Sequence, residues 1–240
     1  MAKIREANKS GESSGGYKRL FNNEKLGLLF SKCHGTSCTN GNELEKIVFK
    51  DNVEDLGGLD NFINEYNKNP NKFANKIFVV TKKSIKKSNY RIKYHDENGK
   101  LKEDQPDGLI FVIADKTCSI IELKDGDNFD TKKSYSERKM LENASNFLSK
   151  KIPFMTEFYI CSFNNNDKLA IKKGFKNVFE TKNIMTGKEL CQILSLNYEE
   201  IINKRNSDAN DNVDYFIDGL LKIDEIKQKI IEKLRREHEE

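Results

Sequence analysis

Apolar residues recur at helical spacing in several stretches of the chain. They do so within residues 20–30, 44–48, 59–66 and 134–150, because positions three and four apart lie on one face of a helix. Polar residues fill 31–42, so we predict a loop there and a helix that begins near Gly41. Ser134 and Glu137 have the spacing of a capping box for the helix over 134–150, and Thr186 and Glu189 have it for a short helix.

The middle of the chain has the pattern of strands instead. Residues 77–80, 90–94 and 154–163 read as strands, and nearly continuous apolar runs flank a turn near Asp115. Runs of this kind favour strands covered on both faces. The order of helices, strands, a helix, a strand and further helices predicts an α/β fold. We expect a central mixed β-sheet flanked by helices, with a helical C-terminal extension.

Three parts are expected along the chain. Residues 1–16 include a run rich in Gly and Ser and are predicted to form a flexible leader. Residues 17–205 are expected to form the folded domain. Residues 206–240 are predicted to be a linker and an amphipathic helix, because 203–212 are polar and an apolar stripe runs from Val213 to Leu234. That stripe packs either on the core or on a partner subunit.

Composition narrows the class of protein. The 240 residues carry 42 basic and 38 acidic side chains, and a net charge of +4 permits an anionic partner without requiring one. The longest apolar run is far shorter than the ~20 residues of a membrane helix, and no signal-peptide core is visible. We therefore expect a cytoplasmic protein with reduced thiols. Cys33, His34 and Cys38 resemble half of a zinc site, but no second half accompanies them.

The two apolar runs of residues 107–124 place three charged side chains together. If the hairpin turns near Asp115, the residue numbers of paired positions add up to about 231. Asp107 then lies opposite Lys124, and Glu122 lies opposite Leu109. Because side chains alternate between faces, both acids and the lysine emerge on one face.

Two carboxylates at one end of a hairpin suit a divalent-metal hydrolytic site. Mg²⁺ is held by a few oxygen ligands and keeps other coordination positions open. Asp107 and Glu122 are the predicted ligands, and the backbone carbonyl of Leu123 is a natural third. Lys124 is then expected beside the attacking water, where it orients the water or stabilises charge in the transition state.

Pro106-Asp107, fourteen residues, and then Glu122-Leu123-Lys124 resemble the PD-(D/E)XK nuclease motif. The predicted order of strands, helix and strand is similar to that family's fold. Many members also carry a glutamate on the first helix that faces the site. Glu45 matches it best by spacing and Glu43 is the rival, whereas the alternative for Glu45 is a solvent-facing residue of a first helical turn.

A small free-standing chain of this kind looks most like a Type II restriction endonuclease. The resemblance implies Mg²⁺-dependent hydrolysis of double-stranded DNA at a short specific sequence, by residues 17–205 as the nuclease domain. It also implies a homodimer and a cognate DNA methyltransferase that protects the host. The alternatives are a repair nuclease or Holliday junction resolvase of the same superfamily, and a non-catalytic DNA-binding module.

Candidate DNA contacts surround the motif. Lys132 and Lys133 precede a predicted helix and are candidates for phosphate binding, and Asn164 and Asn165 are candidates for reading bases. A plain helix cap and a plain loop are the respective alternatives. The basic pairs at 82–83 and 86–87 are candidate phosphate contacts or simply a solvated face.

Overall fold

A computed structural model describes residues 1–6, 15–95, 98–126 and 128–237 of the chain. It divides the chain into two compact units, one made of residues 1–43 and 199–240 and the other of residues 44–198. Position 205, where the sequence suggested the folded domain would end, lies inside a helix of the first unit. No helix within the described residues has both the length and the apolar composition needed to cross a bilayer.

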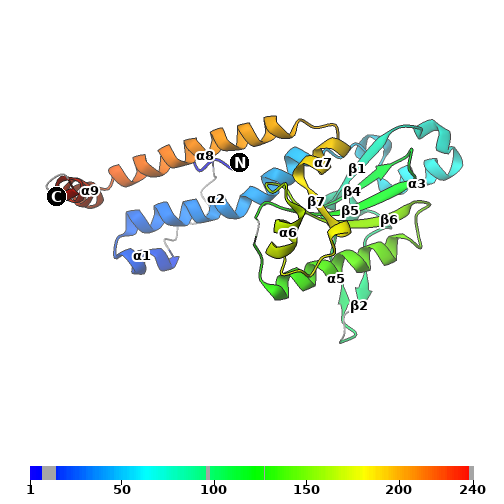
Figure 1. Cartoon of the computed structure of the whole chain (residues 1–240), viewed down its shortest axis with the longest axis horizontal. Coiled ribbons are helices and arrows are strands. Elements are labelled where there is room, and N and C mark those ends of the chain that lie inside the picture. The colour runs from blue at the N-terminus through cyan, green and yellow to red at the C-terminus, as the bar shows by residue number, and fades with distance from the viewer. Residues whose placement is uncertain (7–14, 96–97, 127, 238–240) are drawn as a thin grey trace. The chain divides into compact units, whose positions relative to one another are not determined.

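Residues 44–198 form a five-stranded sheet with the order β1-β4-β5-β6-β7 (Figure 1). The strands are β1 Ile77–Thr81, β4 Gly108–Val112, β5 Thr117–Lys124, β6 Met155–Ser162 and β7 Ile184–Thr186. Strands β1, β4 and β5 pair antiparallel, whereas β5, β6 and β7 pair parallel. The sheet is therefore mixed, which confirms the predicted α/β fold.

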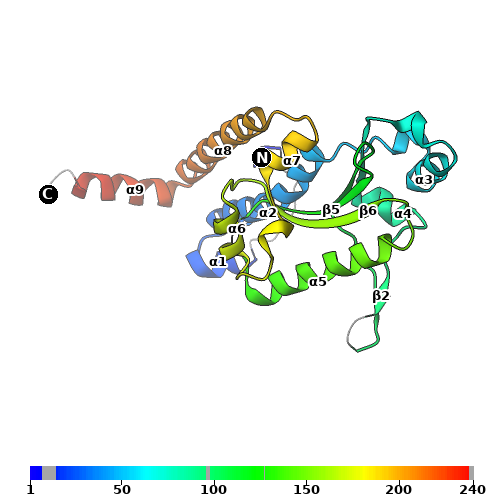
Figure 2. The ribbon, with the colours of Figure 1, turned by 45° about the vertical axis from the view of Figure 1, so that its right-hand side comes forward.

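Helices make up much of both units. They are α1 Gly15–Phe21, α2 Glu24–Val48, α3 Leu59–Lys68, α4 Lys82–Lys87, α5 Thr131–Leu148, α6 Lys168–Gly174, α7 Gly187–Ile193, α8 Tyr198–Leu221 and α9 Asp224–Glu237. Short 3₁₀ turns occupy Glu54–Leu56, Pro70–Phe73 and Thr181–Asn183. Helix α5 runs along one face of the sheet (Figure 2). Leu141 and Leu148 of α5 are buried with Leu109, Phe111 and Ile120 of the central strands in the same core.

The hairpin of β4 and β5 is present, but its register differs by two residues from the prediction. Gly108 pairs with Ile121 and Leu109 pairs with Ile120, so Asp107 comes opposite Glu122 rather than Lys124. The turn is centred one residue earlier than expected, between the paired Val112 and Thr117, where Lys116 adopts a φ of 53° and its amide donates to the carbonyl of Ile113. A shift of two residues leaves every side chain on its predicted face, since the strand repeat is two.

The strand predicted over 90–94 is wrong for most of its length. Only Tyr94–His95 (β2) is extended in a ladder, paired with Leu101–Lys102 (β3) in a separate two-stranded ribbon. The amide and the carbonyl of Ile92 bind the side chain of Gln105, both at 2.9 Å. A buried side-chain amide thus takes the place of a neighbouring strand.

The loop predicted over 31–42 is also wrong, because α2 is continuous from Glu24 to Val48. Two hydroxyls in the polar stretch bond back to helix carbonyls, Thr36 to Lys32 at 2.9 Å and Thr39 to Thr36 at 2.8 Å. Such bonds let threonines remain inside a helix. Apolar packing within this unit, including a 5.5 Å ring contact between Phe30 and Phe216, overrides the weak local propensity.

The polar segment 203–212 is helix rather than linker. Asp208 accepts from the amino group of Met1 at 2.8 Å, and Asn212 accepts from the amide of Ile4 at 2.7 Å. The apolar stripe from Val213 to Leu234 is divided between two helices, α8 and α9, which are separated by residues 222–223.

The first residues of the predicted leader are bound to α8 through Met1 and Ile4. Residues 7–14 of that leader lie outside the described residues.

Helix α5 begins earlier than expected and has a different cap. Asp130 is the N-cap and accepts from the amide of Lys133 at 2.8 Å, so the capping box of Ser134 and Glu137 is wrong. The capping box of Thr186 and Glu189 is confirmed at the start of α7.

Gly187, the first residue of α7, offers a test of packing at the carboxyl edge of the sheet. A Cβ at Gly187 would collide with the carbonyl oxygen of Phe163 and approach the Tyr198 ring to 2.8 Å. We expect Gly187→Ala to lower the free energy of unfolding by at least about 2 kcal/mol, because backbone cannot move aside. Gly41→Ala is the control, since nothing lies within 4 Å of its Cβ position and alanine favours a helix interior by up to ~1 kcal/mol. Denaturant unfolding measures both, and equal stabilities would contradict the packing.

Candidate active site

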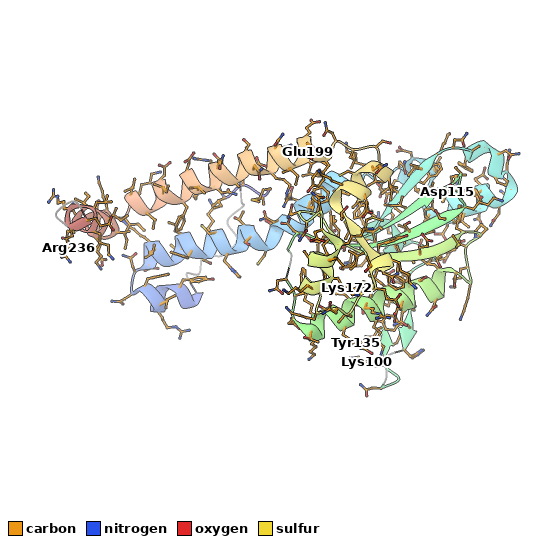
Figure 3. All side chains as sticks on the ribbon, viewed as in Figure 1. Lys100, Asp115, Tyr135, Lys172, Glu199 and Arg236 are labelled. Atoms are coloured by element: carbon orange, nitrogen blue, oxygen red, sulfur yellow. The ribbon has the colours of Figure 1, made fainter. Side chains whose placement is uncertain are left out.

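The candidate site lies where three strands of the sheet end side by side. Lys82 directly follows β1, Asp107 directly precedes β4, and Glu122 lies near the end of β5. The amide of Lys82 donates to the carbonyl of Asp107 at 3.0 Å, which extends the β1–β4 ladder by one pair. Lys82, Asp107 and Glu122 each lie two positions along their strand from Val80, Leu109 and Ile120, respectively. Because side chains alternate between the faces of a strand, the three charged side chains share the face of the sheet that α5 covers. Asp115, labelled in Figure 3, lies in the turn at the far end of the hairpin.

Asp107 is held in one orientation by both of its carboxylate oxygens. Oδ2 accepts from the amide of Leu123 at 2.9 Å, and Oδ1 accepts from Nζ of Lys82 at 3.2 Å. The N–H and C=O of one strand residue point to the same strand edge. The carbonyl of Leu123 is therefore directed to the side of β5 on which Asp107 lies, as a third ligand would require.

Glu122 is buried, and only one of its two carboxylate oxygens has a hydrogen-bond partner among the described residues. Its Oε1 accepts from Nζ of Lys124 at 2.6 Å. Its Oε2 is buried with no hydrogen-bond partner among the residues that the structure describes. Burial and then the negative charge of Asp107 raise the pKa of Glu122 to about 8, against the opposing charge of Lys124. The surroundings thus disfavour the carboxylate, and an added cation would stabilise it.

Lys124 lies between two carboxylates. Besides Glu122, its Nζ donates to Oε1 of Glu137 at 2.8 Å, and all three side chains are at least four-fifths buried. Burial lowers the pKa of Lys124, but the charges of Glu122 and Glu137 outweigh it and raise the pKa well above the usual range. Lys124 is therefore an ammonium, which can donate hydrogen bonds and cannot act as a base.

Lys82 connects the site to solvent. Burial lowers its pKa, but Asp107 and Glu122 more than offset this and raise it. Its side chain remains 41% exposed and lines a cleft of about 340 Å³ together with Lys86, Glu122 and Glu137. The cleft gives a substrate access to the carboxylates.

Glu45 faces the same site from the end of α2. Burial and the charge of Asp107 raise the pKa of Glu45, whereas Lys82 and Lys124 lower it. These interactions place its carboxyl within electrostatic reach of the cluster. Glu45 lies in the last turn of α2 and not in a first turn, and the rival Glu43 belongs to the other unit.

The residues proposed for DNA contacts have local partners. Asn164 donates to the backbone and side-chain oxygens of Asp125 at 2.6 and 2.8 Å, which links the loops after β6 and β5. Asn165 accepts from the amide of Asp167 and so closes a turn. Lys132 and Lys133 are exposed in the first turn of α5, where Nζ of Lys133 lies 5.5 Å from the ring of Phe129. Their roles stay predictions.

Sequence reasoning missed Glu137 as a site residue and left Lys82 among surface lysines. A signal for each is visible in the pattern. Glu137 is a charged residue on the buried face of α5, in the helical series that continues with Leu141, Ala144 and Leu148. Lys82 continues the inward series of Phe78 and Val80 in β1. A charge at an inward position is a sign of a specific partner.

The donor set fits a hard divalent cation better than zinc. No group of three or more His, Cys, Asp and Glu side chains suited to a metal occurs in the described part of the chain, although Sγ of Cys38 and Nε2 of His34 lie 3.7 Å apart. Asp107 and Glu122 nevertheless offer carboxylate oxygens, one of them without a partner. Two carboxylates and a carbonyl are a normal protein contribution to Mg²⁺ binding, which leaves room for water and phosphate.

Comparison with known proteins supports a nucleic-acid enzyme. The chain is 41% identical over 231 residues to the Type II restriction enzyme HhaII from Haemophilus parahaemolyticus, an alignment that covers 96% of this chain and 98% of that protein. No protein-family model matches the chain, and no solved structure matches it.

Proposed function

The chain belongs to the Type II restriction enzymes, and from this premise we propose that it is a Mg²⁺-dependent endonuclease that cuts double-stranded DNA at a short specific sequence. The observation that carries the proposal is the convergence of Asp107, Glu122 and Lys124 at adjoining strand ends, with one buried Glu122 oxygen unpartnered. The motif that contains them supports assignment to the PD-(D/E)XK superfamily.

Each residue of the cluster has a part in the proposed hydrolysis. Asp107 and Glu122 would hold Mg²⁺, with the carbonyl of Leu123 as a further ligand. Bound Mg²⁺ supplies positive charge that neutralises the scissile phosphate. Lys124 donates a hydrogen bond to the attacking water and faces the charge that develops on the phosphate. Glu45 would add a further negative charge beside the cluster, as its electrostatic interaction with Asp107 indicates.

Digestion of DNA of known sequence tests this proposal directly. Purified protein with Mg²⁺ should produce discrete fragments whose ends map to one short sequence, and chelation of Mg²⁺ should stop the reaction. Nicking that follows DNA structure rather than sequence would favour a repair nuclease or junction resolvase. Absence of both cleavage and specific Mg²⁺ uptake by calorimetry would favour a non-catalytic module.

Lys82 is proposed to contact a DNA phosphate at the mouth of the cleft. We expect Lys82→Ala to weaken DNA binding by about threefold to tenfold and to reduce the slope of log affinity against log salt by about one, as loss of one phosphate contact predicts. Binding is measured in Ca²⁺, so that cleavage does not interfere. Lys150→Ala removes an exposed lysine just beyond α5 and is the control. Equal salt slopes for both variants would exclude the phosphate contact.

We also propose that the enzyme is a homodimer that works with a cognate DNA methyltransferase. Cutting both strands of a symmetric site suits two identical subunits. Exposed Val213, Ile217 and Leu221, spaced four residues apart on α8, give one apolar stripe that a second copy would cover. Light scattering of the purified protein gives its mass, and a monomer at micromolar concentration would contradict this assembly.

A further inference from the structure

Glu137 is a largely buried acidic residue without a role in the proposed hydrolysis. It projects from the second turn of α5 on the same helical face as Leu141, Ala144 and Leu148, all fully buried. Its side chain is 17% exposed, and its Oε1 lies 2.8 Å from Nζ of Lys124. Burial of a carboxylate is costly without a partner, and Lys124 is that partner.

The ammonium of Lys124 contacts two carboxylates, and only one of them is a proposed metal ligand. Nζ of Lys124 is 2.6 Å from Glu122, which is the nearer carboxylate, and Glu122 is also the proposed Mg²⁺ ligand. With Glu122 alone, the ammonium would compete with the cation for the same carboxylate. It would also lose its only carboxylate partner whenever Glu122 turned to the cation. A second carboxylate on a different element removes this conflict.

We propose that Glu137 is a positioning residue that fixes the ammonium of Lys124 beside the scissile phosphate while Glu122 holds the metal ion. This inference rests on the proposed function of the same site. In this role Glu137 acts through Lys124. Because α5 lies over the sheet, the packing of Leu141 and Leu148 in the core sets the position of Glu137 and hence that of Lys124.

Rates of cleavage provide the first test. Glu137→Ala should reduce kcat by about tenfold to a hundredfold with little change in KM, because it misplaces a catalytic group without removing a DNA contact. Glu137→Gln should lie between Glu137→Ala and the wild type, since its amide oxygen still accepts from Lys124. The control is Glu142→Gln, on the same helix, which removes an ion pair with Arg138 and should leave the rate unchanged.

A wild-type kcat in Glu137→Ala, or a loss confined to KM, would overturn the inference. Glu137→Gln conserves volume and hydrogen bonding, so it remains informative if the alanine variant does not fold. A rate of Glu137→Gln below that of a folded Glu137→Ala would also count against it, because the retained acceptor would then be of no use.

A spectroscopic test does not depend on cleavage. A buried and paired lysine ammonium exchanges its protons slowly, so Lys124 Nζ should give an NMR signal that is absent in Lys124→Ala. Glu137→Gln should shift this signal and speed its exchange, whereas Glu142→Gln should leave it as in the wild type. An unchanged signal in Glu137→Gln would overturn the inference. If the wild-type protein cut no DNA, the proposed function would fail while this contact could still be verified.

Discussion

Glu122→Gln is expected to reduce Mg²⁺-dependent cleavage by at least about a hundredfold to a thousandfold, the order seen when one preorganised charge-stabilising group is removed. The amide has the same shape but no charge, and it offers a metal only one neutral oxygen. Calorimetry should show Mg²⁺ uptake lost in parallel. Because the raised pKa of Glu122 shows that the fold favours its neutral form, the thermal stability of the variant should equal or exceed that of the wild type.

Asp107→Asn should also lose cleavage, but with loss of stability. Both oxygens of Asp107 accept hydrogen bonds, one from Leu123 and one from Lys82. Asparagine has a single acceptor oxygen, so one of these two bonds is lost. The two variants therefore separate chemistry from folding. Asp115→Asn, an exposed carboxylate in the turn of the same hairpin (Figure 3), is the control and should cut at the wild-type rate. Undiminished cleavage by Glu122→Gln would exclude Glu122 as a metal ligand.

Lys124→Met is the second variant with a large expected effect. We expect cleavage about a hundredfold to ten-thousandfold slower, because both the donor to the water and the charge that faces the phosphate are lost. DNA binding in Ca²⁺ should change little. Lys124→Arg keeps the charge and should retain part of the rate, although the larger planar guanidinium does not reproduce the position of the compact ammonium.

Lys124→Met should also lower the stability of the folded protein. The buried carboxyl groups of Glu122 and Glu137 would lose their shared cation, which lowers the free energy of unfolding by on the order of 3 kcal/mol. Mg²⁺ should restore part of this stability, so it should raise Tm more in the variant than in the wild type. Lys150→Met is the control for loss of an exposed lysine. A Lys124→Met enzyme with the wild-type rate would remove Lys124 from the mechanism.

Local patterns were sufficient for much of the nuclease-like core. The strands at 77–80 and 154–163 and the helix over 59–66 were predictable because apolar periodicity and turn residues agree there. The helical stretches at 31–42 and 203–212 were not, because their polar residues favour loops unless side chains elsewhere in the unit satisfy them. Met1 and Ile4 do this for α8 from more than 200 positions away.

The sequence by itself determined that Asp107, Glu122 and Lys124 share one face at one end of a hairpin. Strand alternation alone ensures this, and it survived a register error of two residues. Only the tertiary structure decided that Lys82 meets Asp107 and that Glu137 meets Lys124. Those contacts depend on β1 pairing with β4 and on α5 packing over the sheet. Both are long-range arrangements, which no local pattern of side chains specifies.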